Sequence, residues 1–333
     1  MLRPMRAVTI REHGEPEVLK LEDLPVPVPG RHQLLVSVHA TSLNPVDARV
    51  RRHPLGPRAF PIVLGYDASG VVAACGADAI GWNVGDQVFG CPNLFGAGAN
   101  ADYVLLDARA AARKPASIDH ATAAALPLVA LTAWESLHTR ARIQPGQTVL
   151  IHGGAGGVGH IAIQLARLHG CRVLTTAGRP ESIAFCRDVL GADQVIDYTS
   201  VDFRAAVRDS TGGRGVDVVL DSLGDETFRR SIECVAPRGQ LVTIVPSSPG
   251  EQAPTLLIRG ITVHYEFMGV AVAFGVDPAS QGAILTSVAR LVDRGLLRVH
   301  VGRRVPLAEL ADAHRAIETA HTTGKIAVVV AGG

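Results

Sequence analysis

From residue 147 onward, short apolar runs alternate with stretches in which apolar residues recur every three or four positions. The apolar runs are typical of strands buried in a sheet, and the recurring positions are typical of helices with one apolar face. The predicted strands are Thr148–His152, Arg172–Ala177, Gln194–Asp197, Val216–Asp221 and Gln240–Val245. The first predicted helices cover residues 158–168 and Pro180–Leu190. This alternation predicts a parallel sheet with crossover helices.

The pattern differs on either side of this region. The first third has short apolar runs, such as Leu34–Val38 and Ser69–Ala73, between dense proline and glycine turn signals, which is typical of a small barrel or sandwich. Residues 119–138 are rich in Ala and Leu and predict helix with a break at Pro127. The tail predicts two helices, up to Gly295 and over about 307–320, and a last strand, Ile326–Val330. A chain of 333 residues with these changes fits two domains.

Composition narrows the classes of function. The chain has 32 Lys and Arg against 31 Asp and Glu, so no general field attracts nucleic acid or an anionic membrane. Its long uncharged runs are interrupted by Gly and Pro, which argues against a membrane span. The five cysteines are scattered and never form C-x-x-C, a pattern that suits a reducing compartment. We therefore expect a soluble cytoplasmic protein with a small-molecule partner.

A G-x-G-x-x-G segment follows the first strand of the predicted parallel sheet. Its residues are Gly154, Ala155, Gly156, Gly157, Val158 and Gly159. In a dinucleotide site, the first glycine permits a tight turn, the second lets the backbone approach a pyrophosphate, and the third lets helix and strand pack closely. The helix that follows would supply free N–H groups and a positive dipole end. The alternative is a tight strand–helix turn that binds nothing.

The end of the second strand bears on the choice of cofactor. An NAD site usually has Asp or Glu there for the ribose 2′-hydroxyl, whereas this chain continues with Gly178 and Arg179. A guanidinium matches a 2′-phosphate, so the sequence favours NADPH over NADH. Glu181 lies close enough to keep NADH open, and Arg179 could also be a solvated loop residue.

Several segments, in this order and spacing, resemble the medium-chain dehydrogenase/reductase superfamily, in its zinc-free quinone oxidoreductase (zeta-crystallin-like) branch. They are Asn44–Asp47, Gly65–Val71, Gly85–Gly90, Ala123–Glu135, the glycine-rich turn, Asp221–Gly224 and Gly324–Ile326. The resemblance implies an α/β architecture in which a GroES-like β-rich catalytic domain (1–125 and 266–333) surrounds a Rossmann doubly wound domain (126–265). It also implies a homodimer paired through an edge of the Rossmann sheet, for which Ile261–Tyr265 is the candidate strand.

The resemblance also bears on metal. Zinc-dependent relatives have a Cys ligand where this chain has Asn44, and a His–Glu pair where it has Tyr66 and Asp67. They also have a lobe with four closely spaced cysteines, which this chain lacks. A catalytic zinc needs three protein ligands from Cys, His or carboxylate. We therefore expect no metal.

The resemblance implies the following site residues. Asn44 would lie beside the nicotinamide or the acceptor oxygen, although an Asn before Pro45 is also common in turns. Asp47 is the second expected catalytic residue, and the alternative is that it is only a structural cap. Further cofactor contacts are expected from Gly178, Arg179, Tyr198, Ser222, Leu223, Gly224 and Lys325. Family members often have a tyrosine shortly after the N-x-x-D segment, but this chain has none there, which leaves His53 or solvent as proton donor.

The implied function is NADPH-dependent hydride transfer to a quinone or an α,β-unsaturated carbonyl. Arg49, Arg51, Arg52 and Arg58 lie within ten positions and could form a basic rim for the phosphates of a CoA ester, or simply a solvated loop. The rim would favour an enoyl-thioester reductase as the alternative. A non-enzymatic NADPH-binding protein is the third possibility.

Overall fold

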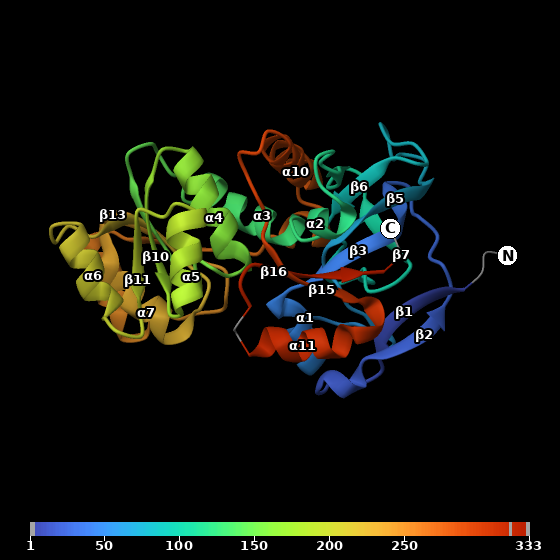
Figure 1. Cartoon of the computed structure of the whole chain (residues 1–333), viewed down its shortest axis with the longest axis horizontal. Coiled ribbons are helices and arrows are strands. Elements are labelled where there is room, and N and C mark those ends of the chain that lie inside the picture. The colour runs from blue at the N-terminus through green and yellow to red at the C-terminus, as the bar shows by residue number, and fades with distance from the viewer. Residues whose placement is uncertain (1–3, 320–321, 331–333) are drawn as a thin grey trace. The chain divides into compact units, whose positions relative to one another are not determined.

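The computed structural model describes residues 4–319 and 322–330, which form two compact units. Unit 1 comprises Met1–Leu131 and Gly269–Gly333, and unit 2 comprises Thr132–Met268. Unit 2 is thus an insertion within unit 1, with boundaries a few residues later than the sequence pattern placed them. Figure 1 shows unit 2 in green to orange and unit 1 in blue, cyan and red. Within the described residues, no helix combines the length and the apolar character needed to cross a membrane.

Unit 2 is built on a six-stranded sheet in which every strand pair is parallel. The strands are β9 (Thr148–Ile151), β10 (Arg172–Ala177), β11 (Gln194–Asp197), β12 (Val216–Asp221), β13 (Val235–Thr243) and β14 (Thr262–Tyr265). Their spatial order is β11-β10-β9-β12-β13-β14. This order reverses direction between β9 and β12, where doubly wound sheets bind ligands at the carboxyl ends of the strands. The predicted doubly wound fold is confirmed.

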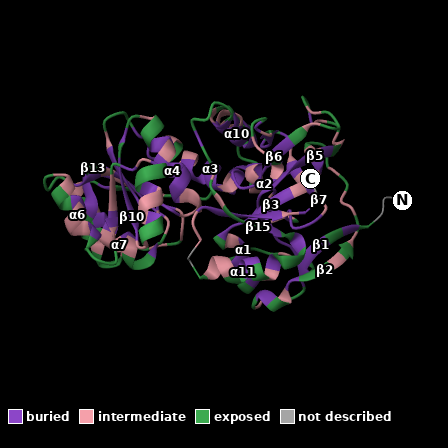
Figure 2. Cartoon of the chain, viewed as in Figure 1, coloured by how far each residue is buried: buried purple, intermediate pink, exposed green. Residues whose placement is uncertain are grey.

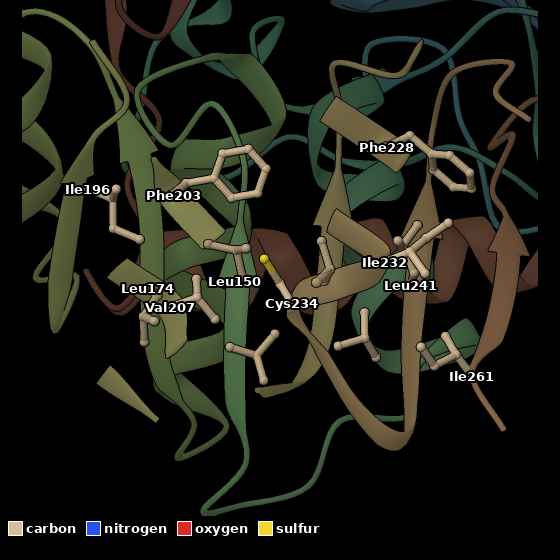
Figure 3. Packing of buried hydrophobic residues seen from close by; sticks show 13 residues of the cluster. Leu150, Leu174, Ile196, Phe203, Val207, Phe228, Ile232, Cys234, Leu241 and Ile261 are labelled. Carbon is tan, nitrogen blue, oxygen red and sulfur yellow. The ribbon is translucent and has the colours of Figure 1, made fainter. Parts of the chain in front are cut away.

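The helices of unit 2 cover both faces of this sheet. They are α4 (Gly157–Leu168), α5 (Pro180–Ala184), α6 (Phe203–Ser210), α7 (Asp225–Cys234) and α8 (Ala253–Arg259). On one face of the sheet, strand residues pack against α6 and α7 (Figure 3). The strands contribute Leu150, Leu174 and Ile196, α6 contributes Phe203 and Val207, and α7 contributes Phe228 and Ile232. Thr175, the neighbour of Leu174, faces the opposite side of the sheet, where its Oγ1 and Ile163 Cδ1 of α4 both lie next to Gly154. Burial on both faces explains why these strands are nearly continuous apolar runs.

Unit 1 is rich in β-structure, as the first third of the sequence predicts. One sheet has the order β2-β1-β4, and a seven-stranded sheet has the order β15-β16-β3-β5-β6-β8, with β7 paired to β3. The strands are β1 (Met5–Ile10), β2 (Lys20–Leu24), β3 (Gln33–Leu43), β4 (Ile62–Val63), β5 (Ala68–Cys75), β6 (Gln87–Gly90), β7 (Tyr103–Asp107), β8 (Ala112–Arg113), β15 (Val301–Pro306) and β16 (Lys325–Val329). Figure 2 shows buried residues concentrated in the strands of both units.

The two sequence segments of unit 1 join in the seven-stranded sheet, where β16 pairs antiparallel with β3. The helices of unit 1 include α1 (Pro45–Arg52), α2 (His120–Ala123), α9 (Val270–Ala273), α10 (Pro278–Asp293) and α11 (Leu310–Glu318). Asn44, the N-cap of α1, and Asp47 form a capping box that fixes the direction of this helix. The register of β16 on β3 pairs Ile326 with Leu43, so that Lys325 lies opposite Asn44.

Three predicted elements differ in detail. The proline at 127 is the first residue of α3 (Pro127–Trp134) rather than only a break, because a first-turn proline has no intrahelical N–H to lose. The helix predicted over Pro180–Leu190 is α5 followed by a π-helical turn, Phe185–Val189. Strand β13 begins at Val235, five positions before the apolar run that predicts it.

Candidate functional site: a dinucleotide-binding turn and a buried polar centre

The glycine-rich turn links β9 to α4. Gly153, directly before the motif, has a φ of +66°, so it makes the tight turn that the sequence pattern assigned to Gly154. A side chain on Gly154 would collide with Thr175 Oγ1 and lie 3.0 Å from Cys186 Sγ, and one on Gly159 would lie 2.8 Å from Gly154 Cα. These two positions therefore need glycine for packing.

Gly156 is different, because it is the N-cap of α4 and an added Cβ would meet only Gly153 O, at 3.1 Å. Helix α4 begins at Gly157. The N–H groups of its first residues, Gly157 and Val158, have no acceptor within the helix. Such a helix end, with a bare Cα before it, can hold a pyrophosphate. Gly156, Gly157 and Val158 are the partly exposed positions of the motif, whereas Gly154, Ala155 and Gly159 are buried beneath them.

A second segment lies at the carboxyl ends of β10 and β11. Gly178 follows β10, and Tyr198 follows β11 and packs on it, since a Cβ on Gly178 would lie 2.5 Å from Tyr198 Cζ. Tyr198 is 57% exposed, so its ring offers a free face. Arg179 is the N-cap of α5, half-buried, and donates to Ser182 Oγ at 3.3 Å. Gly178, Arg179 and Tyr198 therefore form one patch, which could hold the adenosine end of a dinucleotide.

A third segment follows β12 and lies beside the glycine-rich turn. Ser222 Oγ donates to His152 O at 3.1 Å, and Gly224 has a φ of +77° before α7 begins. The backbone N–H groups of Leu223 and Gly224 donate to Asp221, each at 3.1 Å. Burial raises the pKa of Asp221. Its carboxyl group fixes the conformation of the loop by accepting these two N–H groups. Asp221 is thus a structural anchor for the segment Ser222–Gly224.

His152 supports the turn and was not singled out by the sequence pattern. Its Nδ1 lies 3.2 Å from Thr176 Oγ1, which accepts the N–H of Gly153 at 3.1 Å, and its Nε2 lies 2.9 Å from Ser231 Oγ in α7. Ser231 Oγ donates its one proton to Thr227 O at 2.6 Å, so it accepts from Nε2, which carries the His152 proton, and Thr176 Oγ1 donates to Nδ1. Burial lowers the pKa of His152 to about 3, so the ring is neutral. The ring connects the glycine-rich turn to α7.

Unit 1 contains a fully buried polar centre at the start of α1. Asp47 accepts the N–H of Asn44 at 2.8 Å and that of Gly65 at 2.8 Å. Asp67 accepts from Ser42 Oγ at 2.6 Å, from Asn44 Nδ2 at 2.7 Å and from the N–H of Leu128 at 2.7 Å. Lys325 Nζ donates to Asn44 Oδ1 and to Leu43 O, the latter at 3.0 Å. The structure thus brings Asn44, Asp47 and Lys325 together.

Burial controls the titration of this centre. Asn44, Asp47 and Asp67 are at most 1% exposed, and Lys325 is 3% exposed. Desolvation raises the pKa of Asp47 to about 7, and the two backbone N–H groups it accepts only partly oppose this rise. Burial also lowers the pKa of Lys325, against the attraction of Asp67 and Asp47. Lys325, named above as a cofactor contact, has its ammonium directed at Asn44 and Asp67.

His53 and the arginine-rich stretch lie around α1. His53 is exposed at the C-cap of α1, and Arg49 is exposed as well. Arg51, in contrast, is fully buried: Nε donates to Gly14 O at 2.9 Å and Nη2 to Glu318 at 2.6 Å. Arg51 therefore links α1 to α11 and is not part of an exposed basic rim.

The other two arginines of the stretch also have protein partners. Arg52 pairs with Glu15 at 2.9 Å. Arg58 donates to the hydroxyl of Tyr66 at 3.0 Å and to the carbonyls of Val63 and Gly96. Burial raises the pKa of Tyr66 to about 12. Arg58 thus anchors its loop to the segment between β4 and β5, beside the polar centre.

Two family descriptions match the chain. Residues 30–116 match the alcohol dehydrogenase GroES-like domain, and residues 190–328 match the zinc-binding dehydrogenase family. The polar centre does not fit a zinc ion, since Lys325 places an ammonium against the oxygens of Asn44 and Asp67. Over residues 4–319 and 322–330, no three His, Cys, Asp or Glu side chains gather as metal ligands.

Similarity to known proteins places the chain in a family. It is 31% identical to the quinone oxidoreductase of Pongo abelii over 98% of both chains. It is 35% identical to the phthioceranic/hydroxyphthioceranic acid synthase of Mycobacterium tuberculosis over 95% of this chain and 15% of that protein. A mycobacterial protein solved with NADPH is 31% identical, with a TM-score of 0.87 over 98% of this chain and all of the other. The chain belongs to the medium-chain dehydrogenase/reductase superfamily, in its quinone oxidoreductase branch.

Proposed function

We propose that this protein is an NADPH-dependent oxidoreductase that reduces a quinone or an α,β-unsaturated carbonyl without a metal. The observation that carries the proposal is the gathering of the glycine-rich turn, the Gly178–Arg179–Tyr198 patch and the Ser222–Gly224 loop at one edge of the unit 2 sheet. The likeness to a quinone oxidoreductase along the whole chain supports the acceptor class.

The residues of unit 2 fit a dinucleotide. The α4 N-terminus would bind the pyrophosphate, with Gly156 leaving room for it. Arg179 would bind a 2′-phosphate and Tyr198 would pack on the adenosine, which favours NADPH. The NADPH in the solved mycobacterial relative supports this choice. When bound, the nicotinamide supplies a hydride.

The residues of unit 1 would act on the acceptor. A hydride and one proton convert a quinone to a hydroquinone or saturate an enone, so the protein must orient the acceptor and provide a route for the proton. Asn44 has an amide that can donate to an acceptor oxygen, and Asp47 titrates near neutrality. We assign orientation to Asn44, and we assign the proton to solvent or to His53, which is exposed.

An enoyl-thioester reductase is the second candidate function. The similarity to a segment of the mycobacterial phthioceranic/hydroxyphthioceranic acid synthase favours it. The arginine-rich stretch favours it less than the sequence alone would indicate, because Arg51 is buried and Arg52 is paired with Glu15. Arg49 remains the exposed cation of the stretch.

We further infer a homodimer formed through β14. In the described part of the chain β14 pairs with β13 alone, which leaves its other edge open. Leu257 and Ile258 on α8, shortly before β14, are 84% and 83% exposed, and a second copy would cover them. Cys75, Cys171, Cys186 and Cys234 are free thiols, which supports a reducing, cytoplasmic location.

The proposal is tested by following NADPH absorbance with purified protein and three acceptors in parallel. The acceptors are 1,4-benzoquinone, a simple enone and crotonyl-CoA, with NADH in place of NADPH as control. Turnover of the quinone or the enone with NADPH supports the proposal, and turnover of crotonyl-CoA alone supports the second candidate. NADPH binding without turnover of any acceptor would favour a non-enzymatic role.

A further inference from the structure

The carboxamide of Asn44 is held at both ends by groups of opposite chemistry. Its Oδ1 accepts from Lys325 Nζ, and its Nδ2 donates to Asp67 Oδ2 at 2.7 Å. Lys325 Nζ also lies 3.4 Å from Asp67 Oδ2, so the two partners form an ion pair with each other. Asn44, Asp67 and Lys325 thus close a ring of contacts that is at most 3% exposed at any member.

These partners permit one orientation of the amide. An ammonium can only donate and a carboxylate can only accept. A flip of the Asn44 amide would turn its NH₂ group toward the Lys325 ammonium and its oxygen toward the Asp67 carboxylate, so that two hydrogen bonds would be replaced by two repulsions. In a buried site both repulsions are costly, because water cannot screen them.

Only one of the two Asn44 Nδ2 protons is used by this arrangement. Over residues 4–319 and 322–330, the bond to Asp67 is the one hydrogen bond that Asn44 Nδ2 donates. Asp67 is itself fixed by Ser42 and by the N–H of Leu128, so it does not turn to accept the second proton. A buried amide with one fixed and one spare donor is suited to bind a ligand oxygen.

We propose that Lys325 is a positioning residue, which together with Asp67 holds the Asn44 amide so that its free N–H is directed at an oxygen of the bound ligand. The ammonium of Lys325 acts as a built-in cation, coordinated by the oxygens of Asn44, Leu43 and Asp67. This inference rests on the proposed reductase function, in which Asn44 orients the acceptor. It gives Lys325 a role through Asn44 in place of a direct cofactor contact.

The first test measures turnover. We expect Lys325→Met to lower kcat by about 10²-fold, the loss that a misplacement of about 1 Å can cause, with little change in KM for NADPH. Lys325→Arg and Lys325→Ala with added ethylammonium should each recover part of the loss, because both restore a cation. Lys114→Met is the matched control, since Lys114 also donates to backbone carbonyls in unit 1.

The decisive comparison is a double-mutant cycle. If Lys325 acts through Asn44, adding Lys325→Met to Asn44→Ala lowers kcat no further than Asn44→Ala alone. If Lys325 only stabilises the fold, the two losses in kcat multiply. Multiplied losses, or a Lys325→Met protein with the wild-type kcat, would overturn the inference.

A second measurement does not depend on activity or on a variant that folds poorly. The chain has four asparagines and three lysines, so selective isotope labelling gives few NMR signals. In the wild-type protein, we expect Lys325 to titrate below the exposed Lys20, and the side-chain amide of Asn44, identified by its loss in Asn44→Ala, to be protected from solvent exchange. Three lysines that titrate alike would overturn the inference.

The two proposals fail separately. If the wild-type protein reduces no acceptor but still shows the protected amide and the lowered lysine pKa, that result disproves the reductase function but not the positioning of Asn44 by Lys325 and Asp67. If the protein turns over an acceptor but the losses in kcat multiply in the double-mutant cycle, the reductase function is supported and the positioning role of Lys325 is disproved.

Discussion

Arg51 and His314 are both fully buried, and Arg51 Nη1 lies 3.1 Å from His314 Nδ1, joining α1 to α11 across 263 residues of sequence. Since a guanidinium has no acceptor, Arg51 donates and the His314 proton is on Nε2. Burial and, to a smaller extent, the charge of Arg51 together lower the pKa of His314 to about 3. The ring is therefore a neutral acceptor for a buried charge that also pairs with Glu318.

We expect Arg51→Ala to destabilise unit 1 by about 3 kcal/mol or more, because breaking a buried pair leaves its partners unsatisfied. Urea unfolding followed by Trp82 fluorescence in a Trp134→Phe background measures this, since Trp82 lies in unit 1 and Trp134 in unit 2. Arg49→Ala, at an exposed position of the same helix, should cost no more than about 0.5 kcal/mol. Equal effects of the two substitutions would contradict the assignment.

Asp47 makes stability depend on pH. Its pKa is about 7 in the folded protein against 3.8 ordinarily, so between these values the folded state binds more protons than the unfolded state. The stabilisation is complete below pH 3.8 and is lost as the pH rises toward 7, by about 1.4 kcal/mol per unit. The free energy of unfolding of the wild type should therefore fall relative to that of Asp47→Asn between pH 5 and about 7, and then level off. Parallel pH profiles for the two proteins would show that Asp47 is ionised throughout.

Two glycines of the turn should respond differently to alanine. Gly159→Ala forces the new Cβ against Gly153 O and Gly154 Cα, and we expect a loss of about 1–3 kcal/mol in stability. Gly156→Ala meets only Gly153 O, at 3.1 Å, so its melting temperature should fall less than that of Gly159→Ala, while its methyl group weakens NADPH binding by about tenfold, or 1.4 kcal/mol. Thermal melts and NADPH fluorescence titration separate the two effects. If Gly156→Ala binds NADPH normally, the pyrophosphate does not lie over this residue.

Arg179 should determine the choice between the two nicotinamide cofactors. Arg179→Ala removes a charge-assisted contact to the 2′-phosphate, which is worth about 1.5–3 kcal/mol, so the Kd for NADPH should rise about 10- to 100-fold. The Kd for NADH should stay unchanged. Arg187→Ala removes the same charge from an exposed side chain paired with Asp188 and serves as the control. A similar loss for both cofactors would place Arg179 elsewhere in the site.

The proposed dimer predicts that Leu257→Lys with Ile258→Lys produces monomers. Two buried ammonium groups in each copy would oppose association through α8 and β14. Sedimentation velocity of the double variant measures the change. Ile80→Lys, at a 90% exposed apolar position of unit 1, is the matched control and should leave the oligomeric state unchanged. A wild-type protein that sediments as a monomer would disprove the dimer itself.

The sequence alone predicted the parts that depend on local pattern. Buried strands such as β10 and β12 need apolar residues along their whole length, and α4 needs an apolar stripe, so their periods mark them directly. The glycine-rich turn is equally local, because one strand and the next helix contain all its residues. The resemblance added the likeness of Tyr198 and of Ser222–Gly224 to family positions, and these lie at the same sheet edge as the turn.

Only the tertiary structure decided which polar residues are partners. Arg51 belongs to a basic stretch in sequence, yet it is buried because α11 brings His314 and Glu318 to it. Lys325 lies 281 positions from Asn44, and the antiparallel register of β16 on β3 places them together. Such contacts depend on how distant strands and helices pair. A single charged or amide residue forms no periodic pattern in the sequence that would indicate its partner. The polar centre therefore exists only once both ends of the chain have joined one sheet.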